Sequence, residues 1–219
     1  MKRKLCKVVS VLMVLAVLLP LGALAAPMED VSPDDWFYGY VTNGLRFGII
    51  QGVGGGRFEP NRYITRAEFI TMLGRLHEYG NETIRTPGDG PFYERYLAWA
   101  VEMGIIHGNE HGDLMPYAPL NREQMAAIVY RYIRAFELWR IWPADMPRIP
   151  PPEPVADEDE ISEWASCGTF RLRFDELMRG IRRNGVLYFK PHAHTSRAEA
   201  VAVLARLGND IVNNWRAFL

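Results

Sequence analysis

The sequence has few of the residues that build a disulfide framework or bind nucleic acid. Two of the 219 residues are cysteines, Cys6 and Cys167, so disulfides do not organise the fold. The 25 basic residues are outnumbered by 26 acidic ones, and four of the basic residues lie within the first seven positions. The rest of the chain is acidic. We therefore expect no nucleic-acid partner, because phosphate binding needs an excess of basic side chains.

Long apolar runs are absent outside the N-terminus. The first 25 residues have the layout of a secretory signal peptide, with a basic start, an apolar run from Val8 to Leu19 and small residues at 23–25. We expect cleavage after Ala25 and export of the protein. An uncleaved membrane anchor is the alternative, but Pro20 interrupts an apolar stretch that barely reaches the roughly 20 residues that span a bilayer.

Two segments of the chain share one pattern at identical spacing. In both, a glycine follows the leading aromatic residue by 12 positions and an arginine follows it by 30. These residues are Trp36, Gly48 and Arg66 in the first segment, and Phe92, Gly104 and Arg122 in the second. A third segment is looser, because Gly180 follows Trp164 by 16 positions and precedes Arg197 by 17. The difference of four positions corresponds to about one helical turn. The sequence therefore predicts three repeats, of which the third is divergent.

Each segment is expected to form a helix, an irregular loop and a second helix. Apolar residues recur at helical spacing on both sides of the loop, and a glycine ends the first helix. A unit of about 50 residues cannot bury such a stripe alone, so the units should pack together. We predict an all-α fold in which three helix-loop-helix repeats pack as a pseudo-threefold bundle. The predicted parts are a signal peptide (1–25), repeat 1 (26–80), repeat 2 (81–141), a proline-rich linker (142–156), a divergent repeat 3 (157–208) and a C-terminal tail (209–219).

Each predicted second helix begins with a capping box. In this motif a polar side chain and a Glu or Gln three positions later satisfy backbone N–H groups of the first turn. The pairs are Thr65 with Glu68, Asn121 with Gln124, and Ser196 with Glu199. The boxes do not explain the arginine that follows each cap, at Arg66, Arg122 and Arg197. A cation there faces the positive end of the helix dipole, which costs a few tenths to about 1 kcal/mol.

Two explanations of these three arginines are open. The first is an anionic ligand, because free N–H groups at a helix start and a planar guanidinium form a site for carboxylate or phosphate. The second is that each arginine pairs with an acid of a neighbouring unit, such as Asp34, Asp35 or Glu94, and fastens the repeats together. The two explanations are compatible.

The order of these motifs resembles the S-layer homology family. The resemblance rests on Trp36, on 48–52, on 58–60 and on 64–68, and residues 157–164 resemble the usual start of such a repeat. It implies a three-repeat helical domain that holds exported proteins on the wall of mainly Gram-positive bacteria. It also implies a noncovalent ligand, a secondary cell wall polysaccharide that often carries a pyruvate ketal and lies in grooves between repeats.

The resemblance also assigns ligand-binding residues. They are Arg66, Arg122, Arg197, Thr65, Asp35, Trp36, Gly52 and Gly108. The sequence departs from the family pattern in three places: Asn121 replaces the motif threonine, Phe92 the leading tryptophan, and Arg183 the second loop glycine of the third unit. Because a side chain at that glycine would crowd a sugar, we expect the third groove to contribute least to binding.

No metal site or cofactor is predicted. His107 and His111 lie on either side of a glycine in a loop, so they lack the helical geometry of a zinc motif. His192 and His194 flank a turn with no acid or thiol at ligand spacing. The acidic run 157–160 lacks the ligand and glycine pattern of a calcium-binding loop, and we expect it to be solvated.

We expect no enzymatic activity. The sequence has no serine nucleophile motif, and only 28–34 and 208–219 lie outside the repeated motifs and the linker, which leaves no room for a catalytic domain. The resemblance and the residues together predict a secreted cell-surface protein that binds wall polysaccharide and anchors noncovalently to the cell wall. The alternative is a noncatalytic surface scaffold that recruits a protein partner noncovalently and retains sugar binding only in part.

Overall fold

A computed structural model describes residues 28–80, 83–87, 90–138 and 151–216. The predicted signal peptide (1–25), residues 142–150 of the predicted linker and residues 217–219 of the predicted tail lie outside the described residues. We refer to residues 28–80 as unit 1, to 83–138 as unit 2 and to 151–216 as unit 3.

The regular secondary structure of the described chain consists of helices and one short hairpin, which confirms the all-α prediction. Unit 1 contains α2 (Tyr38–Arg46) and α3 (Arg66–Gly80), unit 2 contains α4 (Glu94–Glu102) and α5 (Arg122–Ala135), and unit 3 contains α6 (Glu163–Phe174) and α7 (Arg197–Arg216). In unit 3 a 3-10 turn, η2 (Glu158–Glu160), precedes α6, and strands β1 (Ile181–Arg183) and β2 (Val186–Tyr188) pair antiparallel. No helix among the described residues is both long enough and apolar enough to span a membrane.

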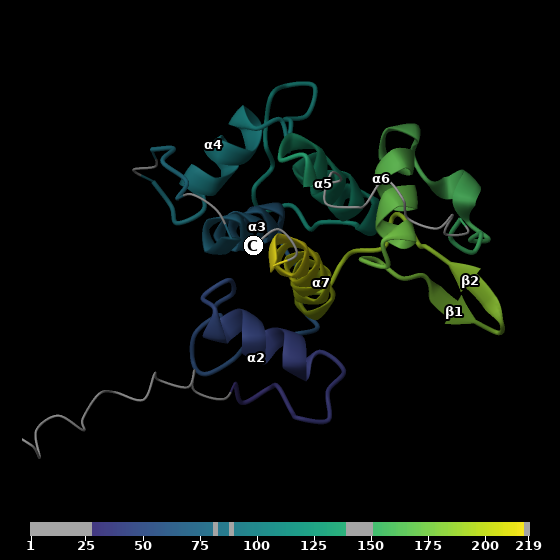
Figure 1. The fold of residues 1–219 in the computed structure, drawn as a ribbon, viewed down its shortest axis with the longest axis horizontal. Coiled ribbons are helices and arrows are strands. Elements are labelled where there is room, and N and C mark those ends of the chain that lie inside the picture. The colour runs from purple at the N-terminus through teal and green to yellow at the C-terminus, as the bar shows by residue number, and fades with distance from the viewer. Residues whose placement is uncertain (1–27, 81–82, 88–89, 139–150, 217–219) are drawn as a thin grey trace, which may run out of the picture.

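The second helices of the three units form the centre of the molecule. Figure 1 shows α3, α5 and α7 in the middle, with α2, α4 and α6 outside them. Helix α4 packs on α3, α6 packs on α5, and α2 packs on α7. Each outer helix therefore packs on the central helix of the preceding unit, and unit 1 closes the circle on unit 3. The apolar stripes are buried between units rather than within them.

The units meet at a closed ring of three backbone hydrogen bonds. The N–H of Ile64 donates to the carbonyl of Thr195 (3.0 Å), that of Thr195 to Leu120 (2.9 Å), and that of Leu120 to Ile64 (3.0 Å). All three side chains are fully buried. Each of the three residues contributes one backbone N–H donor and one carbonyl acceptor. The ring therefore satisfies buried backbone groups that are not hydrogen-bonded within a helix or a sheet.

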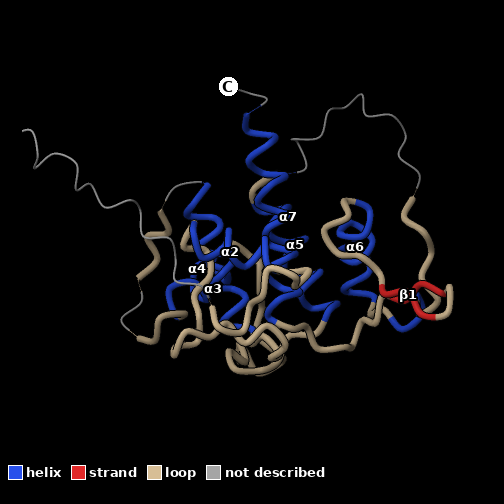
Figure 2. Tube along the Cα trace, turned by 90° about the horizontal axis from the view of Figure 1, so that it is seen from below, coloured by secondary structure: helices blue, strands red, loops and turns tan. Residues whose placement is uncertain are grey.

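The three predicted capping boxes are confirmed. The box at Thr65 and Glu68 has bonds of 2.9 and 3.3 Å, the one at Asn121 and Gln124 has 3.1 and 2.9 Å, and the one at Ser196 and Glu199 has 2.8 and 3.2 Å. The first N–H of each central helix also donates to a carbonyl of the next unit, at 2.9 to 3.0 Å. The loops that supply these carbonyls gather at one end of the helices (Figure 2).

The residue that follows the first helix of each unit shows that the predicted alignment of unit 3 with units 1 and 2 is wrong. Gly48 and Gly104 follow α2 and α4 in the left-handed conformation, with φ of 70° and 66°. In unit 3 the corresponding residue is Glu176, with φ of 55°, which follows Trp164 by 12 positions as in the other units. The match of Gly180 to these glycines, and the extra helical turn that it implied, are therefore wrong. The additional residues lie after Glu176, in the loop that forms the hairpin. A left-handed glutamate costs roughly 1–2 kcal/mol, so the position favours glycine without requiring it.

Thr195 gives a test of the ring. Its hydroxyl is buried and has no hydrogen-bond partner among the described residues, whereas Ile64 and Leu120 place apolar side chains at the same position. Because a buried unpaired hydroxyl is unfavourable, Thr195→Val should stabilise the fold by about 1 kcal/mol. We expect a rise in melting temperature of about 2–4 °C. The matched control is Thr42→Val, since the Thr42 hydroxyl is exposed and bonded at 2.8 Å to the Tyr38 carbonyl. A lower melting temperature for Thr195→Val would contradict this account.

Candidate functional site

The three predicted arginines lie at the junctions between units. Each begins a central helix and donates a hydrogen bond from Nη2 to a loop carbonyl of the next unit, just before a glycine. The pairs are Arg66 with His107 (2.8 Å), Arg122 with Arg179 (2.9 Å) and Arg197 with Gln51 (3.0 Å). The loop glycine of unit 3 is therefore Gly180, which corresponds to Gly52 and Gly108.

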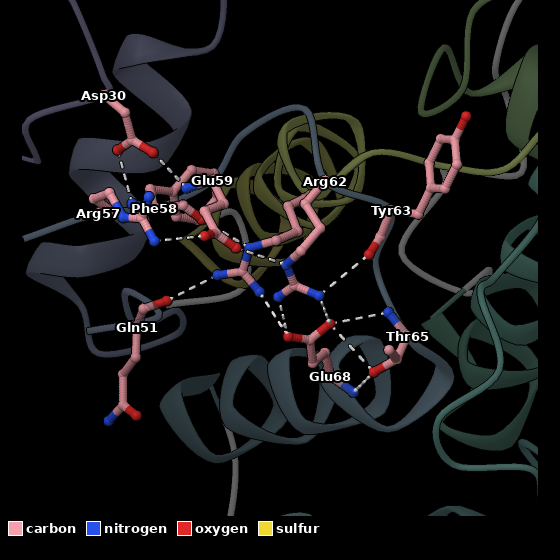
Figure 3. Close-up of polar contacts among 10 residues, drawn as sticks. Asp30, Gln51, Arg57, Phe58, Glu59, Arg62, Tyr63, Thr65 and Glu68 are labelled. Carbon is pink, nitrogen blue, oxygen red and sulfur yellow. Dashed lines mark hydrogen bonds and ion pairs between the residues drawn. The ribbon is translucent and has the colours of Figure 1, made fainter. Parts of the chain in front are cut away.

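The guanidinium group of Arg197 is fully engaged in contacts within the protein. The side chain is 2% exposed, Nε donates to the Phe58 carbonyl (2.9 Å), and Nη1 lies 3.1 Å from a Glu68 oxygen. The guanidinium carbon lies 4.7 Å from the centre of the Phe58 ring. Figure 3 shows Glu68 also bonded to Arg62 and to the backbone of Thr65. Burial lowers the pKa of Arg197, although Glu68 acts in the opposite direction. All three nitrogens have partners and the residue is almost fully buried, so Arg197 is poorly placed to contact a ligand.

Arg122 has a similar environment. It is 6% exposed, its Nε donates to the Phe189 carbonyl (2.7 Å), and its Nη1 lies 3.7 Å from Glu199. The geometry of Arg122 and Arg197 favours the explanation that these arginines fasten the units together. The acids differ from those expected: Glu68 and Glu199 supply the charge, whereas the Asp35 carboxylate accepts from the backbone of Ser32 at 2.8 Å.

Arg66 differs from the other two arginines. Nη2 makes the only hydrogen bond of this guanidinium to the described residues, and Nε is buried without a partner. Two differences in sequence distinguish this junction from the other two. Gln124 stands at the capping position where Glu68 and Glu199 provide an acid, and Leu114 stands where Phe58 and Phe189 provide a ring. Burial and the charge of Arg131 both lower the pKa of Arg66.

The Arg66 side chain lines a groove of about 380 Å³, which we call the Arg66 groove. Its lining includes Arg66, Arg131, Gln124, Gly108, Asp113 and Trp164. Arg131 is half-buried and has no hydrogen bond or ion pair with the described residues. Asp113 accepts a hydrogen bond from the backbone of Met115 (2.8 Å) and forms no ion pair within the described chain. The groove therefore contains two guanidinium groups that no acid pairs with, and all three units contribute to it.

Arg131 and Trp164 were not assigned to the site from the sequence, although a signal for Arg131 was present. An arginine follows the first arginine of each central helix by nine positions, at Arg75, Arg131 and Arg206. Arg75 donates to the side chain of Gln51 (3.3 Å) and Arg206 to the carbonyl of Leu177 (2.9 Å). The sequence could not show that Arg131 is the one without such a partner in the described chain.

The remaining predicted residues have mainly structural roles. The hydroxyl of Thr65 belongs to its capping box. A Cβ on Gly52 would lie 2.7 Å from the Arg57 carbonyl, and one on Gly108 would lie 2.5 Å from Gly112, so both glycines allow their loops to close. Trp36 is 60% exposed and lies beside Arg122, in a small cavity of about 170 Å³, rather than beside Arg66.

Unit 3 keeps its loop glycine, which corrects another prediction. A Cβ on Gly180 would lie 2.7 Å from the Leu187 side chain and 3.1 Å from the Tyr188 carbonyl, a less severe contact than the backbone contacts at Gly52 and Gly108. Arg183, which was expected to replace this glycine, is exposed at the end of β1. It does not crowd the junction.

The acidic segment before α6 is exposed at Glu158, Asp159 and Glu160, as expected, but Asp157 is buried. Asp157 is 5% exposed and accepts hydrogen bonds from the backbone of Phe189 and Lys190, both at 2.7 Å. The described residues contain no group of three or more His, Cys, Asp or Glu side chains that could hold a metal ion. His192 lies 3.3 Å from Glu123 in a contact between units.

Comparison with known proteins fits this geometry. Residues 27–70 and 86–126 match the S-layer homology domain. The matched segments include Arg66 and Arg122, whereas Arg197 lies outside them. The S-layer homology segments therefore contain both arginines that begin α3 and α5, together with the loop that Arg66 contacts.

Three relatives illustrate the similarity. The chain is 28% identical to an endoglucanase of Bacillus sp. (strain KSM-635) over 84% of its own length and 19% of the relative. It is 31% identical to the surface-layer 125 kDa protein of Lysinibacillus sphaericus over 48% of its length and 10% of the relative. It is 26% identical to the S-layer protein sap of Bacillus anthracis over 63% of its length and 17% of the relative. The chain thus spans about a fifth or less of these curated relatives.

The different environments of the arginines predict different effects on stability. Arg197→Ala should destabilise the fold by about 3 kcal/mol, because it leaves two carbonyls without their donor and removes one contact of Glu68, which keeps Arg62. Arg66→Ala removes one hydrogen bond and should cost about 1 kcal/mol. Urea unfolding followed by circular dichroism measures both values. Equal losses would show that Arg66 is as much a structural residue as Arg197.

Proposed function

We propose that this chain is a noncatalytic module that anchors an exported protein to the bacterial cell wall by noncovalent binding of an anionic wall polysaccharide. The two S-layer homology segments and the S-layer relatives support anchoring. The endoglucanase also fits, because the chain matches 19% of that enzyme. The proposal includes export by residues 1–25, a Gram-positive type of wall, and a secondary cell wall polysaccharide that carries acidic groups such as a pyruvate ketal.

The observation that carries the proposal is that no acid of the described chain pairs with Arg66 or Arg131. Partial burial of a guanidinium is unfavourable unless it is paired. An anion that enters the Arg66 groove would supply hydrogen-bond acceptors for the buried Nε and for Arg131. Trp164 offers an exposed aromatic face at the same groove, on which a sugar ring can pack. We therefore assign ligand binding to Arg66, Arg131 and Trp164, with Gly108 in the lining.

We also propose that unit 3 is a third, divergent repeat. It shares the backbone ring, the capping box, the left-handed residue after its first helix and the arginine junction with the other units. The match to the endoglucanase extends over 84% of the chain and so beyond the two S-layer homology segments. Under this proposal Trp164 belongs to the repeat structure and completes the groove between the first two units.

Substitution of the two arginines tests the function. Arg66→Ala and Arg131→Ala should each weaken binding to purified cell walls by about tenfold or more, because each removes a charge-assisted hydrogen bond worth about 1.5–3 kcal/mol. The control is Arg134→Ala, which removes the same charge from an exposed position on α5, the helix that carries Arg131. Binding is measured by co-sedimentation with walls before and after removal of their polysaccharide, with helix content as the check on folding.

Two further outcomes separate the alternatives. Arg66→Lys keeps the charge but loses the planar fork, so binding should still fall if the contact is bidentate. Binding should also weaken as salt rises, because exposed charges are screened over about 8–10 Å at physiological ionic strength. If wall binding survives the loss of both arginines, the anionic-ligand proposal is wrong and a scaffold that recruits a protein partner becomes the better explanation.

A further inference from the structure

Building on the proposed function, we infer that the Arg66 groove selects a sugar bearing a doubly charged acid group, such as a phosphate monoester. We further infer that Gln124 is the residue that leaves this charge unneutralised. The junction at Arg66 has an amide at the capping position where the other two junctions have a carboxylate. The inferred preference is for one kind of ligand, whereas the proposed function requires only that an anion binds.

The two glutamates at the capping position each use both carboxylate oxygens. Glu68 accepts the capping bond from Thr65 with Oε2 and contacts Arg197 with Oε1 (3.1 Å). Glu199 accepts from Ser196 with Oε2 and lies 3.7 Å from Arg122 with Oε1. One side chain therefore both caps its own helix and neutralises the arginine of the preceding unit.

Gln124 can do only the first of these tasks. Its single side-chain oxygen accepts the capping bond from the backbone of Asn121 (3.1 Å). Its other terminal group is NH₂, which is a donor and cannot accept a hydrogen bond from Arg66. The capping box is thus complete, while Arg66 lacks the carboxylate that lies beside Nη1 of Arg122 and Arg197. The buried Nε of Arg66 is a second difference, because Nε of Arg122 and Arg197 donates to a backbone carbonyl rather than to a glutamate.

The groove contains two positive charges rather than one. Arg131 lines the same cavity and also has no acidic partner in the described chain, whereas its counterparts Arg75 and Arg206 bond to Gln51 and Leu177. A single carboxylate neutralises one of the two guanidinium groups. A phosphate monoester carries nearly two charges and three terminal oxygens, so it can accept from both forks. The acid in the lining, Asp113, is exposed and bonded to the backbone of Met115.

The test uses three hexoses that differ in charge: glucose 6-phosphate, glucuronate and glucose. Each is titrated into the full chain by isothermal calorimetry at pH 7.5 and constant ionic strength, where the phosphate, with its second pKa near 6, is mostly doubly charged. We expect glucose 6-phosphate to bind about tenfold more tightly than glucuronate, and glucose to show no binding. Arg131→Gln should remove most of the difference between the two acids.

Gln124→Glu is the decisive variant. It retains the capping box, because Glu68 and Glu199 cap in the same way, so the melting temperature should be unchanged or higher. The added carboxylate should pair with Arg66 and weaken binding of glucose 6-phosphate by tenfold or more. Gln124→Met is the matched neutral variant; it weakens the cap but adds no charge, so it should retain the preference.

The inference is overturned if glucuronate binds as tightly as glucose 6-phosphate, or if Gln124→Glu leaves binding unchanged while the chain remains folded. These outcomes are independent of the proposed function. Arg66-dependent wall binding without a preference for the doubly charged sugar would preserve the function and reject the inference. A preference for glucose 6-phosphate in a chain that does not bind walls would preserve the inference and reject the function.

Discussion

The closed ring of backbone hydrogen bonds at Ile64, Leu120 and Thr195 is the constraint on which the other features of the fold depend. Each central helix begins two positions after its ring residue, so the ring places the three helix starts around one axis. The capping boxes and the first arginines then occupy corresponding positions. Because every unit donates to one neighbour and accepts from the other, loss of one unit breaks two of the three bonds. The junctions are therefore a property of the whole assembly.

The packing of the outer helices reinforces this dependence. Helices α4, α6 and α2 pack on the central helices of the units before them, α3, α5 and α7. The close approach of α6 to α5 requires Gly168, where a Cβ would lie 3.0 Å from the carbonyl of Ala126. Trp164 also lies on α6. The packing of α6 on α5 therefore brings an aromatic side chain from unit 3 to the Arg66 groove. Stability and the candidate site thus share one set of contacts.

One chemical difference separates a structural junction from a candidate binding site. The same arginine, on the same turn of helix, is neutralised by a carboxylate at two junctions and faces an amide at the third. A buried charge with a good partner fastens two elements together, whereas a charge without one favours an external anion. The repeats therefore supply three equivalent positions, and under our proposal the identity of a single capping residue decides which of them is open to a ligand.

The sequence by itself determined the helix starts, the capping boxes, the apolar stripes and the spacing of units 1 and 2, because these features depend on residues three or four positions apart. It misaligned unit 3, since Glu176 adopts the backbone conformation that elsewhere marks a glycine. Only the tertiary structure decided which arginine has no acidic partner in the described chain. Arg197 and its partner Glu68 are 129 positions apart, and neither local spacing nor the motif shows which acid faces which guanidinium. That depends on the closure of the ring, which sets units distant in the chain side by side.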